Sequence, residues 1–553
     1  MLEKFLPRET FVSYEDFKEN YRVIIPENFN FAYDVIDEWA IEKPDKTAMV
    51  WCNDEGDEKI FTFRDMKLLS DKAANLFKSS GINKGDVVML ILKRRWQYWV
   101  CTLGLQKVGA VSIPATSQLT KKDIVYRSNA ASVKMIISVL EDELVSSVEA
   151  SLQESPTVIC KALVDSPREG WIDFNAELEK MPEQWVRPSG EMAAGGNETM
   201  LMYFTSGTTG MPKIVLHNFL HPIGHIVTAH YWQRLGEEGL HLTVSESGWA
   251  KCGWGKIYGQ WICGVSIFVY DMNKFVPENL LKVMEKYRLT SFCAPPTIYR
   301  FLIKEDLSKY DLSSIKTACT AGEPLNPEVY YQFKRSTGLD IIEGFGQTES
   351  TVLCANFEWI TPRPGSMGKP SPLYDIDIID DLGRSCPPGI EGSIVIKNLD
   401  KAVPPGLFRG YYRDREATER VWSNGTYNTG DVAWRDEDGY FWFVGRSDDV
   451  IKCSGYRIGP FEVESALIEH PAVLECAVTS APDQVRGQVV KATIVLAKGW
   501  SPSEKLVKEL QEHVKRVTAP YKYPRIVDFV DELPKTVSGK IRRGEIRQND
   551  RIK

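Results

Sequence analysis

The fold and the chemistry of this chain depend on one stretch, Tyr203-Phe204-Thr205-Ser206-Gly207-Thr208-Thr209-Gly210-Met211-Pro212-Lys213. An apolar run at 200–204 leads into it, and a β-branched run at 214–216 follows. Both runs have the composition of short strands, so the small residues between them predict a strand–loop–strand turn. The glycines let backbone N–H groups approach a ligand closely and the lysine adds a positive charge, which together suit a polyphosphate.

Two other interpretations of this loop must be weighed. A Walker A loop requires G-x-x-x-x-G-K-[ST] followed by a helix, and the sequence has neither feature here. An ordinary Ser/Thr/Gly hairpin would have the same local composition. The loop by itself therefore leaves both phosphate binding and a plain turn open.

The rest of the chain alternates between helix and strand signals. A capping box at Thr62 and Asp65 opens a helical stripe, a fully apolar strand is expected at 87–92, and a second helix at 96–107. Strand signals return at 110–114 and 135–137, so the pattern predicts an α/β fold with doubly wound sheets. The polar segment 166–198 is expected to be an irregular connection.

Composition bounds the class of protein. The chain has 553 residues, which is more than a single hydrophobic core usually accommodates, so two or more domains are expected. A net charge of -8 gives no general attraction for nucleic acid or an anionic membrane. Eleven cysteines without a C-x-x-C pair fit buried thiols in a reducing compartment, and no signal-peptide pattern or membrane-spanning apolar run is present, so a cytoplasmic location is expected.

Four further motifs follow the loop in order. Ala321-Gly322-Glu323-Pro324-Leu325 comes after a strand-like segment, at the edge where α/β sheets bind ligands. Glu343-Gly344-Phe345-Gly346-Gln347-Thr348-Glu349 repeats the arrangement after 340–342, and its last carboxylate could hold Mg²⁺. Asp431 is expected at a turn that suits ribose hydroxyls, and Gly445-Arg446-Ser447-Asp448-Asp449 precedes 451–457. Each motif alone is ambiguous, but the order of the motifs along the chain indicates the class of protein.

Taken in order, these motifs resemble the adenylate-forming superfamily of acyl-CoA synthetases, luciferases and peptide-synthetase adenylation domains, over the chain from about Phe29 to its end. The segments 248–256 and 454–464 look most like the medium-chain acyl-CoA synthetase branch. The tail 533–543, Leu-Pro-Lys-Thr-Val-Ser-Gly-Lys-Ile-Arg-Arg, is similar to the C-terminal lysine motif of the superfamily and contains Lys540.

The resemblance implies a two-step ligase that uses ATP, Mg²⁺ and coenzyme A. A carboxylate and ATP would give an acyl-adenylate, and coenzyme A would then displace AMP. The implied catalytic residues are Lys540, which neutralises charge between the carboxylate and the α-phosphorus, and Glu349, which holds the metal. By the same resemblance, nucleotide would be bound by Thr205, Ser206, Gly207, Thr208, Thr209, Gly210, Lys213, Gly322, Glu323, Pro324, Glu343, Gly344, Phe345, Gly346, Gln347, Thr348, Asp431, Arg446 and Arg457.

The resemblance also implies two domains that rotate between the half-reactions. Residues 1–447 would form a large domain of several subdomains and 448–553 a small mobile α+β lid, with the hinge at Asp448. Lys540 would serve the first state, and Gly455 would line the pantetheine path in the second. Coenzyme A candidates are Gln118, Ser454, Gly455, Tyr456, Arg486, Lys515, Tyr523 and Arg525, although a solvated surface explains lysines and arginines equally well.

The sequence says less about which carboxylic acid is the substrate. Gly253, Trp254 and Lys256 are the substrate candidates, and Trp254 between two glycines is expected to line the acyl pocket. The leading hypothesis is a ligase for short- to medium-chain or branched carboxylic acids. The alternatives are an aryl- or benzoate-type ligase and a non-catalytic nucleotide-binding regulator. The expected partners are a small carboxylic acid, ATP and coenzyme A, without nucleic acid or membrane, and a homo-oligomer is compatible with the sequence.

Three histidines, His217, His221 and His225, recur at helical spacing like metal ligands. Pro222 intervenes and no H-E-x-x-H pattern is present, so packing and hydrogen bonding are favoured over zinc. His470, before Pro471, is expected to cap a helix rather than mark a cation site. Cys252 and Cys453 adjoin functional motifs and are expected to be small buried hydrophobes.

Overall fold

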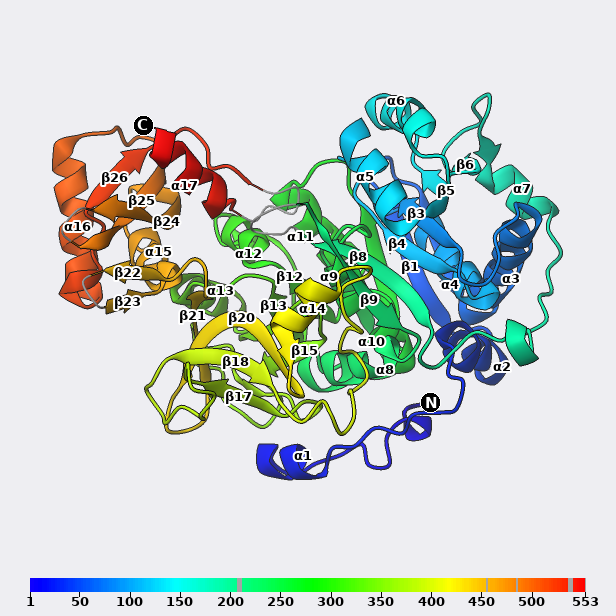
Figure 1. Ribbon diagram of the computed structural model, residues 1–553, viewed down its shortest axis with the longest axis horizontal. Coiled ribbons are helices and arrows are strands. Elements are labelled where there is room, and N and C mark those ends of the chain that lie inside the picture. Colours follow the sequence, from blue (N-terminus) through cyan, green and yellow to red (C-terminus); the bar gives the residue numbers. More distant parts are fainter. Residues whose placement is uncertain (206–210, 454–455, 484–485, 536–540, 553) are drawn as a thin grey trace.

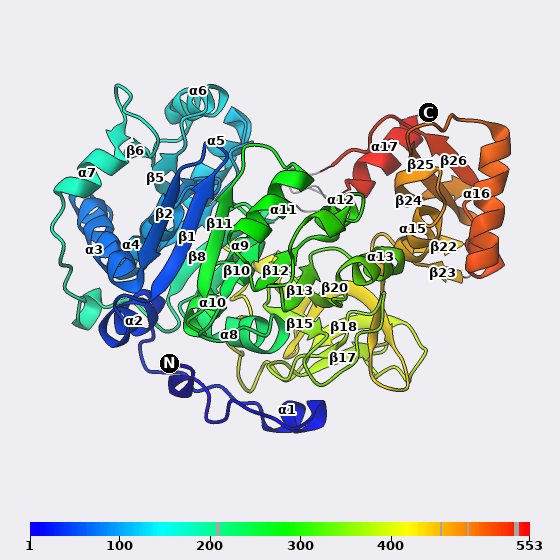
Figure 2. The same cartoon turned by 180° about the vertical axis from the view of Figure 1, so that it is seen from behind.

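The computed structural model describes the chain except for residues 206–210, 454–455, 484–485, 536–540 and 553, and the side chains of 549–552. Figure 1 shows two large sheets with their helices, a smaller antiparallel sheet beside them, and a C-terminal unit at one end of the molecule. The opposite view in Figure 2 shows the strands of the two large sheets running side by side through the centre.

The first sheet is seven-stranded and has the order β7-β6-β5-β3-β4-β8-β9. All neighbours are parallel except the hairpin β8–β9, so the predicted doubly wound arrangement is confirmed. Its strands are β3 (Val87–Ile91), β4 (Val111–Pro114), β5 (Val133–Ser138), β6 (Cys160–Leu163), β7 (Ile172–Asp173), β8 (Thr199–Thr205) and β9 (Lys213–Asn218). Its helices are α3 (Phe63–Ser79), α4 (Gln97–Val108), α5 (Lys121–Ala131), α6 (Asp142–Ser151) and α7 (Phe174–Lys180), with short turns η3 (Leu152–Glu154) and η4 (Gly190–Met192).

Local sequence explains how these elements begin and pack. Thr62 and Asp65 form the predicted capping box at the start of α3, with reciprocal side-chain and backbone hydrogen bonds. Helix α4 packs closely on α3 because Gly104 has no side chain; a Cβ there would lie 2.6 Å from the Cβ of Ala73. The expectation that 166–198 is irregular is wrong in part, since the segment holds β7 and α7, whose cap is Asp173.

The second sheet has nine strands in the order β16-β15-β14-β13-β12-β10-β11-β1-β2, parallel through its centre and antiparallel at both edges. Its strands are β1 (Thr47–Asn53), β2 (Glu58–Thr62), β10 (Leu240–Thr243), β11 (Ser266–Asp271), β12 (Ser291–Ala294), β13 (Thr317–Ala321), β14 (Ile341–Gly346), β15 (Val352–Ala355) and β16 (Lys369–Pro370). Its helices are α8 (His221–Ile226), the π-helix η5 (Val227–Trp232), α9 (Ala250–Gly255), α10 (Tyr258–Ile262), α11 (Pro277–Lys286), α12 (Pro296–Leu302), η6 (Leu307–Lys309) and α13 (Pro327–Thr337).

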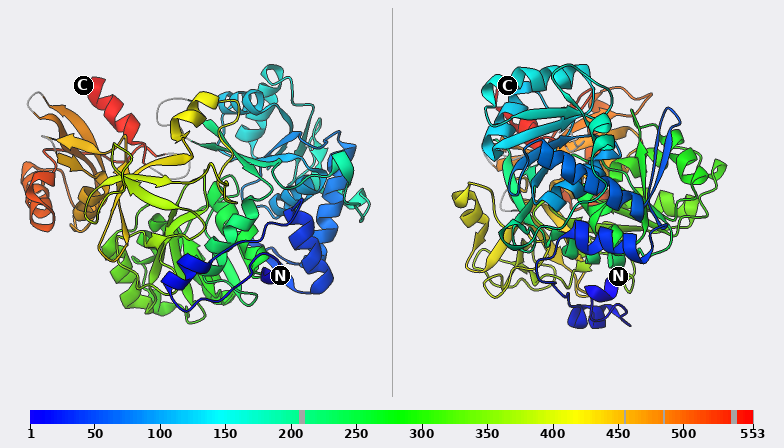
Figure 3. Two further views of the ribbon diagram at one scale, coloured as in Figure 1. Left: turned by 60° about the horizontal axis from the view of Figure 1, so that its bottom comes forward. Right: turned by 90° about the vertical axis from the view of Figure 1, so that its right-hand side faces the viewer.

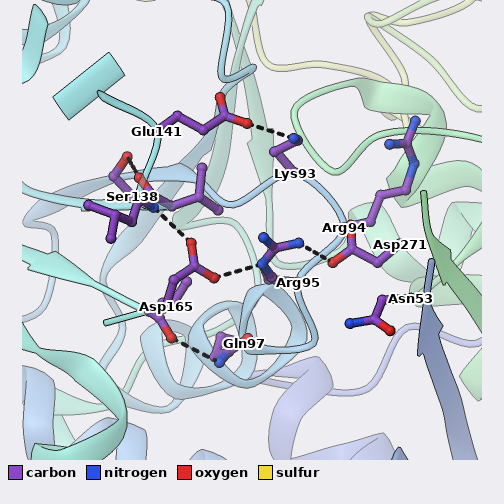
Figure 4. A network of polar contacts seen from close by, with 12 residues as sticks. Asn53, Lys93, Arg94, Arg95, Gln97, Ser138, Glu141, Asp165 and Asp271 are labelled. Carbon is purple, nitrogen blue, oxygen red and sulfur yellow. Dashed lines mark hydrogen bonds and ion pairs between the residues drawn. The ribbon is translucent and has the colours of Figure 1, made fainter. Parts of the chain in front are cut away.

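Arg95 links these two large sheets at the carboxyl ends of their strands (Figure 4). Its guanidinium pairs with Asp165, which follows β6, at 2.7 Å, and with Asp271, the last residue of β11, at 2.5 Å. Nearby, Lys93 pairs with Glu141 at 2.6 Å. Charged side chains therefore fix the relative position of the two sheets at this edge.

The third sheet is antiparallel, with the order β17-β18-β20-β19 and β21 paired to β20. It consists of β17 (Ile376–Ile379), β18 (Gly392–Ile396), β19 (Trp422–Ser423), β20 (Thr426–Arg435) and β21 (Phe441–Arg446), with α14 (Arg415–Val421) beside it. The C-terminal unit has the order β23-β22-β25-β24, with β26 parallel to β25. Its elements are β22 (Ile451–Cys453), β23 (Tyr456–Ile458), α15 (Pro460–Ile468), β24 (Val473–Asp483), β25 (Gly487–Leu496), α16 (Glu504–Val517), η7 (Pro520–Lys522), β26 (Ile526–Phe529) and α17 (Arg543–Ile552), which is the expected α+β composition.

The N-terminal segment lies along the outside of the large body (Figure 3). It contains η1 (Leu2–Lys4), α1 (Tyr14–Asn20), η2 (Ala32–Asp37) and α2 (Glu38–Glu42). Aromatic packing holds it in place: the Phe17 ring lies 4.5 Å from that of Tyr231 and 4.9 Å from that of Trp359. In the part of the chain that is described, no helix has both the length and the apolar character needed to cross a membrane.

Candidate active site

The site is built on the hairpin β8–β9, whose existence the sequence predicts. Thr205, the last residue of β8, pairs directly with Lys213, the first residue of β9. The segment 409–412 runs alongside β9, with hydrogen bonds from Leu216 N to Gly410 O (3.2 Å) and from Tyr412 N to Ile214 O (2.8 Å). Ser206, Gly207, Thr208, Thr209 and Gly210 lie outside the described residues, as do Ser454, Gly455 and Lys540.

Lys213 and Glu349 are connected through Tyr411. The Lys213 ammonium lies 4.7 Å from the centroid of the Tyr411 ring, a cation–π distance. The Tyr411 hydroxyl donates to Glu349 Oε1 at 2.9 Å, and Phe408 N donates to the Glu349 carbonyl at 2.8 Å. Two residues from separate sequence motifs are thereby brought to one place.

Asp431 lies inside β20 and not at a turn, so that expectation is wrong. Gly430, with φ of 73°, and a register shift at Val432 bend the strand locally, which is why the Thr-Gly-Asp sequence resembles a turn. Asp431 is 3 % exposed and pairs with Arg446 on the neighbouring strand. Burial raises the pKa of Asp431 to about 6, and the positive charge of Arg446 opposes that rise.

Gln347 joins Asp431 to the Glu349 segment. Its amide donates to Asp431 Oδ2 and, at 2.8 Å, to the carbonyl of Thr429, while the Tyr427 hydroxyl donates to its Oε1 at 2.7 Å. Because Gln347 and Glu349 are two residues apart, a single short segment reaches both Asp431 and Tyr411.

The motif 343–349 lies partly within β14, and its first residue faces the core. Glu343 is 4 % exposed, and burial raises its pKa to about 8. Its Oε1 accepts from the backbone N–H of Leu325 at 3.4 Å, so the carboxyl lies beside the turn that follows β13. Gly344 and Gly346 are required by packing: a Cβ would lie 2.5 Å from Trp232 and 2.3 Å from Trp254, respectively.

The turn after β13 is open to the site. Gly322 has φ of 103° and no heavy atom within 4 Å of a Cβ built on it. Lys251 donates to the carbonyl of Ala321 at 2.8 Å. Glu323 lies 3.8 Å from Arg300, and Pro324 completes the turn. Phe345 packs on Phe443 with ring centroids 6.1 Å apart.

Trp254 lines a small cavity, and Lys256 does not. The cavity is about 10 Å³, enough for roughly one water molecule, and Trp254 is 8 % exposed. Lys256 is 1 % exposed, its ammonium donates to the Ser245 carbonyl at 2.7 Å, and burial lowers its pKa to about 8. The cavity is lined by Trp232, Gln233, Thr243, Lys251, Trp254, Gly255, Cys293 and Ala321.

The structure places Lys251, which the sequence did not single out, at this cavity in place of Lys256. Lys251 and Trp254 are three positions apart in α9 and so share a face, whereas Lys256 lies two positions beyond Trp254. Helical spacing could have identified Lys251. Gly253 is placed by packing, because a Cβ would lie 2.9 Å from the Tyr203 hydroxyl.

Four of the coenzyme A candidates with described positions form two groups on the lid. Tyr456 is exposed and stacks on Tyr521, with ring centroids 4.2 Å apart. The Tyr523 ring has Lys515 Nζ at 4.3 Å and Arg525 at 4.7 Å. Sequence reasoning missed Tyr521, which carries no motif of its own.

The remaining candidates belong to neither group: Arg457 was expected to bind nucleotide, and Arg486 and Gln118 were expected to bind coenzyme A. Arg457 on the lid pairs with Asp381 of the large body at 3.3 Å. Backbone N–H groups of Arg486 and Gln118 donate to Asp483 Oδ1 (2.7 Å) and Thr116 Oγ1 (3.4 Å).

Asp448 lies in the turn between β21 and β22. Its neighbour Asp449 forms an ion pair with Arg547 of α17. Arg543 pairs with the buried Glu464 at 2.8 Å, so the ends of the lid sequence are held together. Asn326 Nδ2 donates to the Ser465 carbonyl across to the large body at 3.3 Å.

The histidines at 217, 221 and 225 pack against one another. The described residues contain no group of three or more His, Cys, Asp or Glu side chains that could hold a metal ion. His470 accepts from Ala472 N at 3.2 Å through Nδ1, and Cys252 and Cys453 are buried free thiols.

Comparison with known proteins identifies the class. The AMP-binding enzyme model matches residues 36–412, and the model of the C-terminal domain of AMP-binding enzymes matches 462–540. The chain therefore belongs to the AMP-binding enzyme family.

Its relatives are acyl-coenzyme A synthetases. The mitochondrial ACSM3 of Mus musculus is 43 % identical, with 98 % of this chain and 94 % of that protein covered. The mitochondrial ACSM4 of Homo sapiens is 44 % identical, with 95 % and 91 % covered. The crystal structure of the anthranilate CoA ligase AuaEII with anthranoyl-AMP superposes with a TM-score of 0.87 at 28 % identity, covering 96 % of this chain and 98 % of that one.

The chain is an AMP-forming acyl-CoA synthetase. It converts a carboxylic acid and ATP to an acyl-adenylate and pyrophosphate, and then forms the acyl-CoA thioester with release of AMP. The aryl-CoA ligase and non-catalytic alternatives are not favoured. The expected cytoplasmic location is wrong, because these relatives are mitochondrial enzymes. Buried reduced cysteines indicate a reducing environment but do not distinguish one such compartment from another.

Proposed function

We propose that this synthetase activates short- to medium-chain or branched carboxylic acids. The indoles of Trp232 and Trp254, packed on Gly344 and Gly346, support this, because they leave little depth for a long chain beside Trp254. The relatives are named acyl-coenzyme A synthetases, which supports an acyl acid as the substrate.

The segment 347–349 carries the proposed arrangement of ATP. Gln347 contacts Asp431, the ribose residue, while Glu349 contacts Tyr411 beneath Lys213. One segment thus lies between the ribose position and the phosphate position. Lys213 would bind the β- and γ-phosphates together with the loop 206–210, and the turn 322–324 would line the adenine.

The carboxylate oxygen of Glu349 fits Mg²⁺, a hard cation that prefers oxygen ligands and usually binds through one or two carboxylates plus phosphates. When bound, the ion would neutralise phosphate charge. The acid is already nucleophilic, so the protein's task is to hold two anions together, and Lys213, Arg446 and Lys540 supply positive charge for it.

The proposed domains are 1–447 and 448–553, joined at Asp448. Rotation about this turn would exchange Lys540 for Gly455 at the reacting atoms and bring Tyr456 and the Lys515–Tyr523–Arg525 group toward coenzyme A. We further propose that nucleic acid is not a partner, because the net charge of -8 disfavours phosphate polymers.

The test is AMP formation across acids of graded length and branching, with and without coenzyme A. A maximum among short, medium or branched acids, with pyrophosphate release that does not require coenzyme A, is expected. A maximum among aromatic acids would overturn the proposed acid class.

A further inference from the structure

Three buried histidines form a column between the acyl pocket and the segment that holds Glu349. His217 and His221 have ring centroids 3.9 Å apart, and His221 and His225 have centroids 4.6 Å apart with their Nε2 atoms at 3.1 Å. None is more than 2 % exposed. His221 and His225, four residues apart in α8, face the same side of that helix, and His217 reaches His221 from the end of β9.

His217, at the first end of the column, binds the backbone beside the proposed metal ligand. Its Nε2 lies 2.7 Å from the carbonyl oxygen of Thr348. A carbonyl only accepts, so Nε2 carries the proton and donates. Burial lowers the pKa of His217 to about 4, so the ring is neutral and has this single N–H. Its Nδ1 has no hydrogen-bond partner among the described residues.

The position of His217 on β9 explains why it reaches this carbonyl. Lys213 and His217 are four residues apart in one strand, so both point to the same side. Lys213 reaches Tyr411, which donates to the Glu349 carboxylate, while His217 reaches the peptide just before Glu349. Strand β9 therefore supports both the side chain of Glu349, through Tyr411, and the backbone at Thr348.

At the far end the column meets the acyl pocket. The ring of His225 lies 6.1 Å from Trp254 and 5.9 Å from Tyr258, with which it stacks. Gly259 allows this contact, because a Cβ there would lie 2.2 Å from the His225 carbonyl oxygen. The three rings thus fill the space between Trp254 and Thr348.

We propose that His217 is a positioning residue for the adenylation step: its Nε2–H fixes the Thr348 carbonyl, so that Glu349 is held ready for the metal–phosphate group, and the rings of His221 and His225, packed edge to face, keep the imidazole in place. The inference rests on the proposed function, in which Glu349 binds the metal. His217 touches neither the metal nor the substrate, and it acts through the backbone.

The test compares His217→Gln with His217→Asn. The Gln amide nitrogen takes approximately the place of Nε2 and keeps the donor, whereas the Asn amide is too short to reach Thr348. The measurement is the affinity for Mn²⁺ in the presence of α,β-methylene ATP, followed from free Mn²⁺ by electron paramagnetic resonance. His217→Asn is expected to weaken Mn²⁺ binding about tenfold, the scale of one buried hydrogen bond lost, and His217→Gln less than about threefold.

A second readout separates positioning from loss of structure. Thioester formation from supplied acyl-adenylate needs no metal, so it should change less than about threefold in both variants, and the melting temperatures of the two should agree. The matched control is His230→Asn. The Nδ1 atom of His230 also bonds a backbone carbonyl, that of Leu235, at 2.8 Å, but this bond is not part of the Thr348–Glu349 segment. It should leave Mn²⁺ affinity unchanged.

Native Mn²⁺ affinity in His217→Asn, or equal weakening in the Asn and Gln variants, would overturn the role of His217. Glu349→Gln tells this failure apart from a failure of the proposed function. Should Glu349→Gln bind Mn²⁺ like the wild type, the metal assignment is wrong and the role of His217 with it. Should Glu349→Gln lose Mn²⁺ while His217→Asn retains it, only the role of His217 is wrong.

Discussion

Nη1 of Arg446 lies 3.3 Å from Oδ1 of Asp431 on the adjacent strand, and the same carboxylate accepts from the amide of Gln347. Asp431 is buried, so its charge depends on these partners and on pH. Its pKa of about 6 falls within the range where the enzyme can be assayed.

The first prediction concerns ribose binding and pH. If Asp431 accepts from ribose hydroxyls as a carboxylate, adenosine affinity should fall as pH drops through about 6, because protonation removes the charge that favours binding. From the ionised fraction, affinity should fall about tenfold between pH 7 and pH 5. The measurement is adenosine binding by calorimetry, since adenosine has no phosphate that titrates there.

Two controls isolate the carboxylate. Asp431→Asn should bind weakly at every pH, and 2′,3′-dideoxyadenosine should show little pH dependence with the wild type. A steep profile for the dideoxy compound would assign the titration to a group other than Asp431.

The second prediction concerns stability and Glu343. Its folded pKa of about 8 is raised from 4.5, so the folded state holds a proton that the unfolded chain releases at lower pH. Stability contributed by this group is present below about pH 4.5, is lost as pH rises toward 8, and then levels off. Glu343→Gln removes this dependence, so the variant should gain about 1 kcal/mol on the wild type per pH unit within that window.

Thermal midpoints of both proteins at pH 5.5, 6.5, 7.5 and 8.5 provide the measurement. The exposed Glu278→Gln serves as the control and should show a constant difference from the wild type. A constant difference for Glu343→Gln as well would mean that Glu343 is ionised in the folded protein.

The third prediction concerns Lys540, which lies outside the described residues and is assigned by its motif. Lys540→Ala should lower the adenylation rate at least about a hundredfold, the scale of losing one directed electrostatic stabiliser. Thioester formation from supplied acyl-adenylate should change far less. Pyrophosphate exchange and thioester assays on the purified variant measure the two steps.

Gly455→Leu is the converse variant. Its added side chain should block thioester formation while leaving pyrophosphate release detectable. Equal losses of both half-reactions in Lys540→Ala would exclude separate states for them.

The fourth prediction concerns Trp254 as the floor of the acyl pocket. Each methylene that fits should add at most about 0.8 kcal/mol, whereas a steric floor gives an abrupt limit in chain length. Trp254→Gly should move the optimum to longer or bulkier acids and weaken the binding of short ones, which would leave a partly empty cavity. The comparison needs kcat/KM for straight, branched and aromatic acids on both proteins.

Gly346→Ala tests the same proposed floor of the pocket, because Gly346 packs against the Trp254 indole. A Cβ at Gly346 would lie 2.3 Å from the Trp254 ring, so the indole must shift and the profile should change again. If both variants keep the wild-type profile and differ only in its height, Trp254 has a structural role and the floor is elsewhere.

Local patterns in the sequence were enough to predict most of the helices and strands of the first large sheet, and the motifs were enough to predict the family. The capping box at Thr62 and Asp65, the hairpin β8–β9 and the alternation of helices and strands follow from interactions between residues close in the chain, which local patterns encode. The order of the motifs then indicated the reaction.

Which of these side chains are buried and which line a cavity depends on packing between elements that are distant in the sequence. Asp431 lies in a bent strand, Glu343 is buried, and Lys251 instead of Lys256 lines the cavity beside Trp254. The link from Lys213 through Tyr411 to Glu349 joins residues distant in sequence. Burial and contacts of this kind arise when separate strands and helices pack together, so neighbours along the chain cannot encode them.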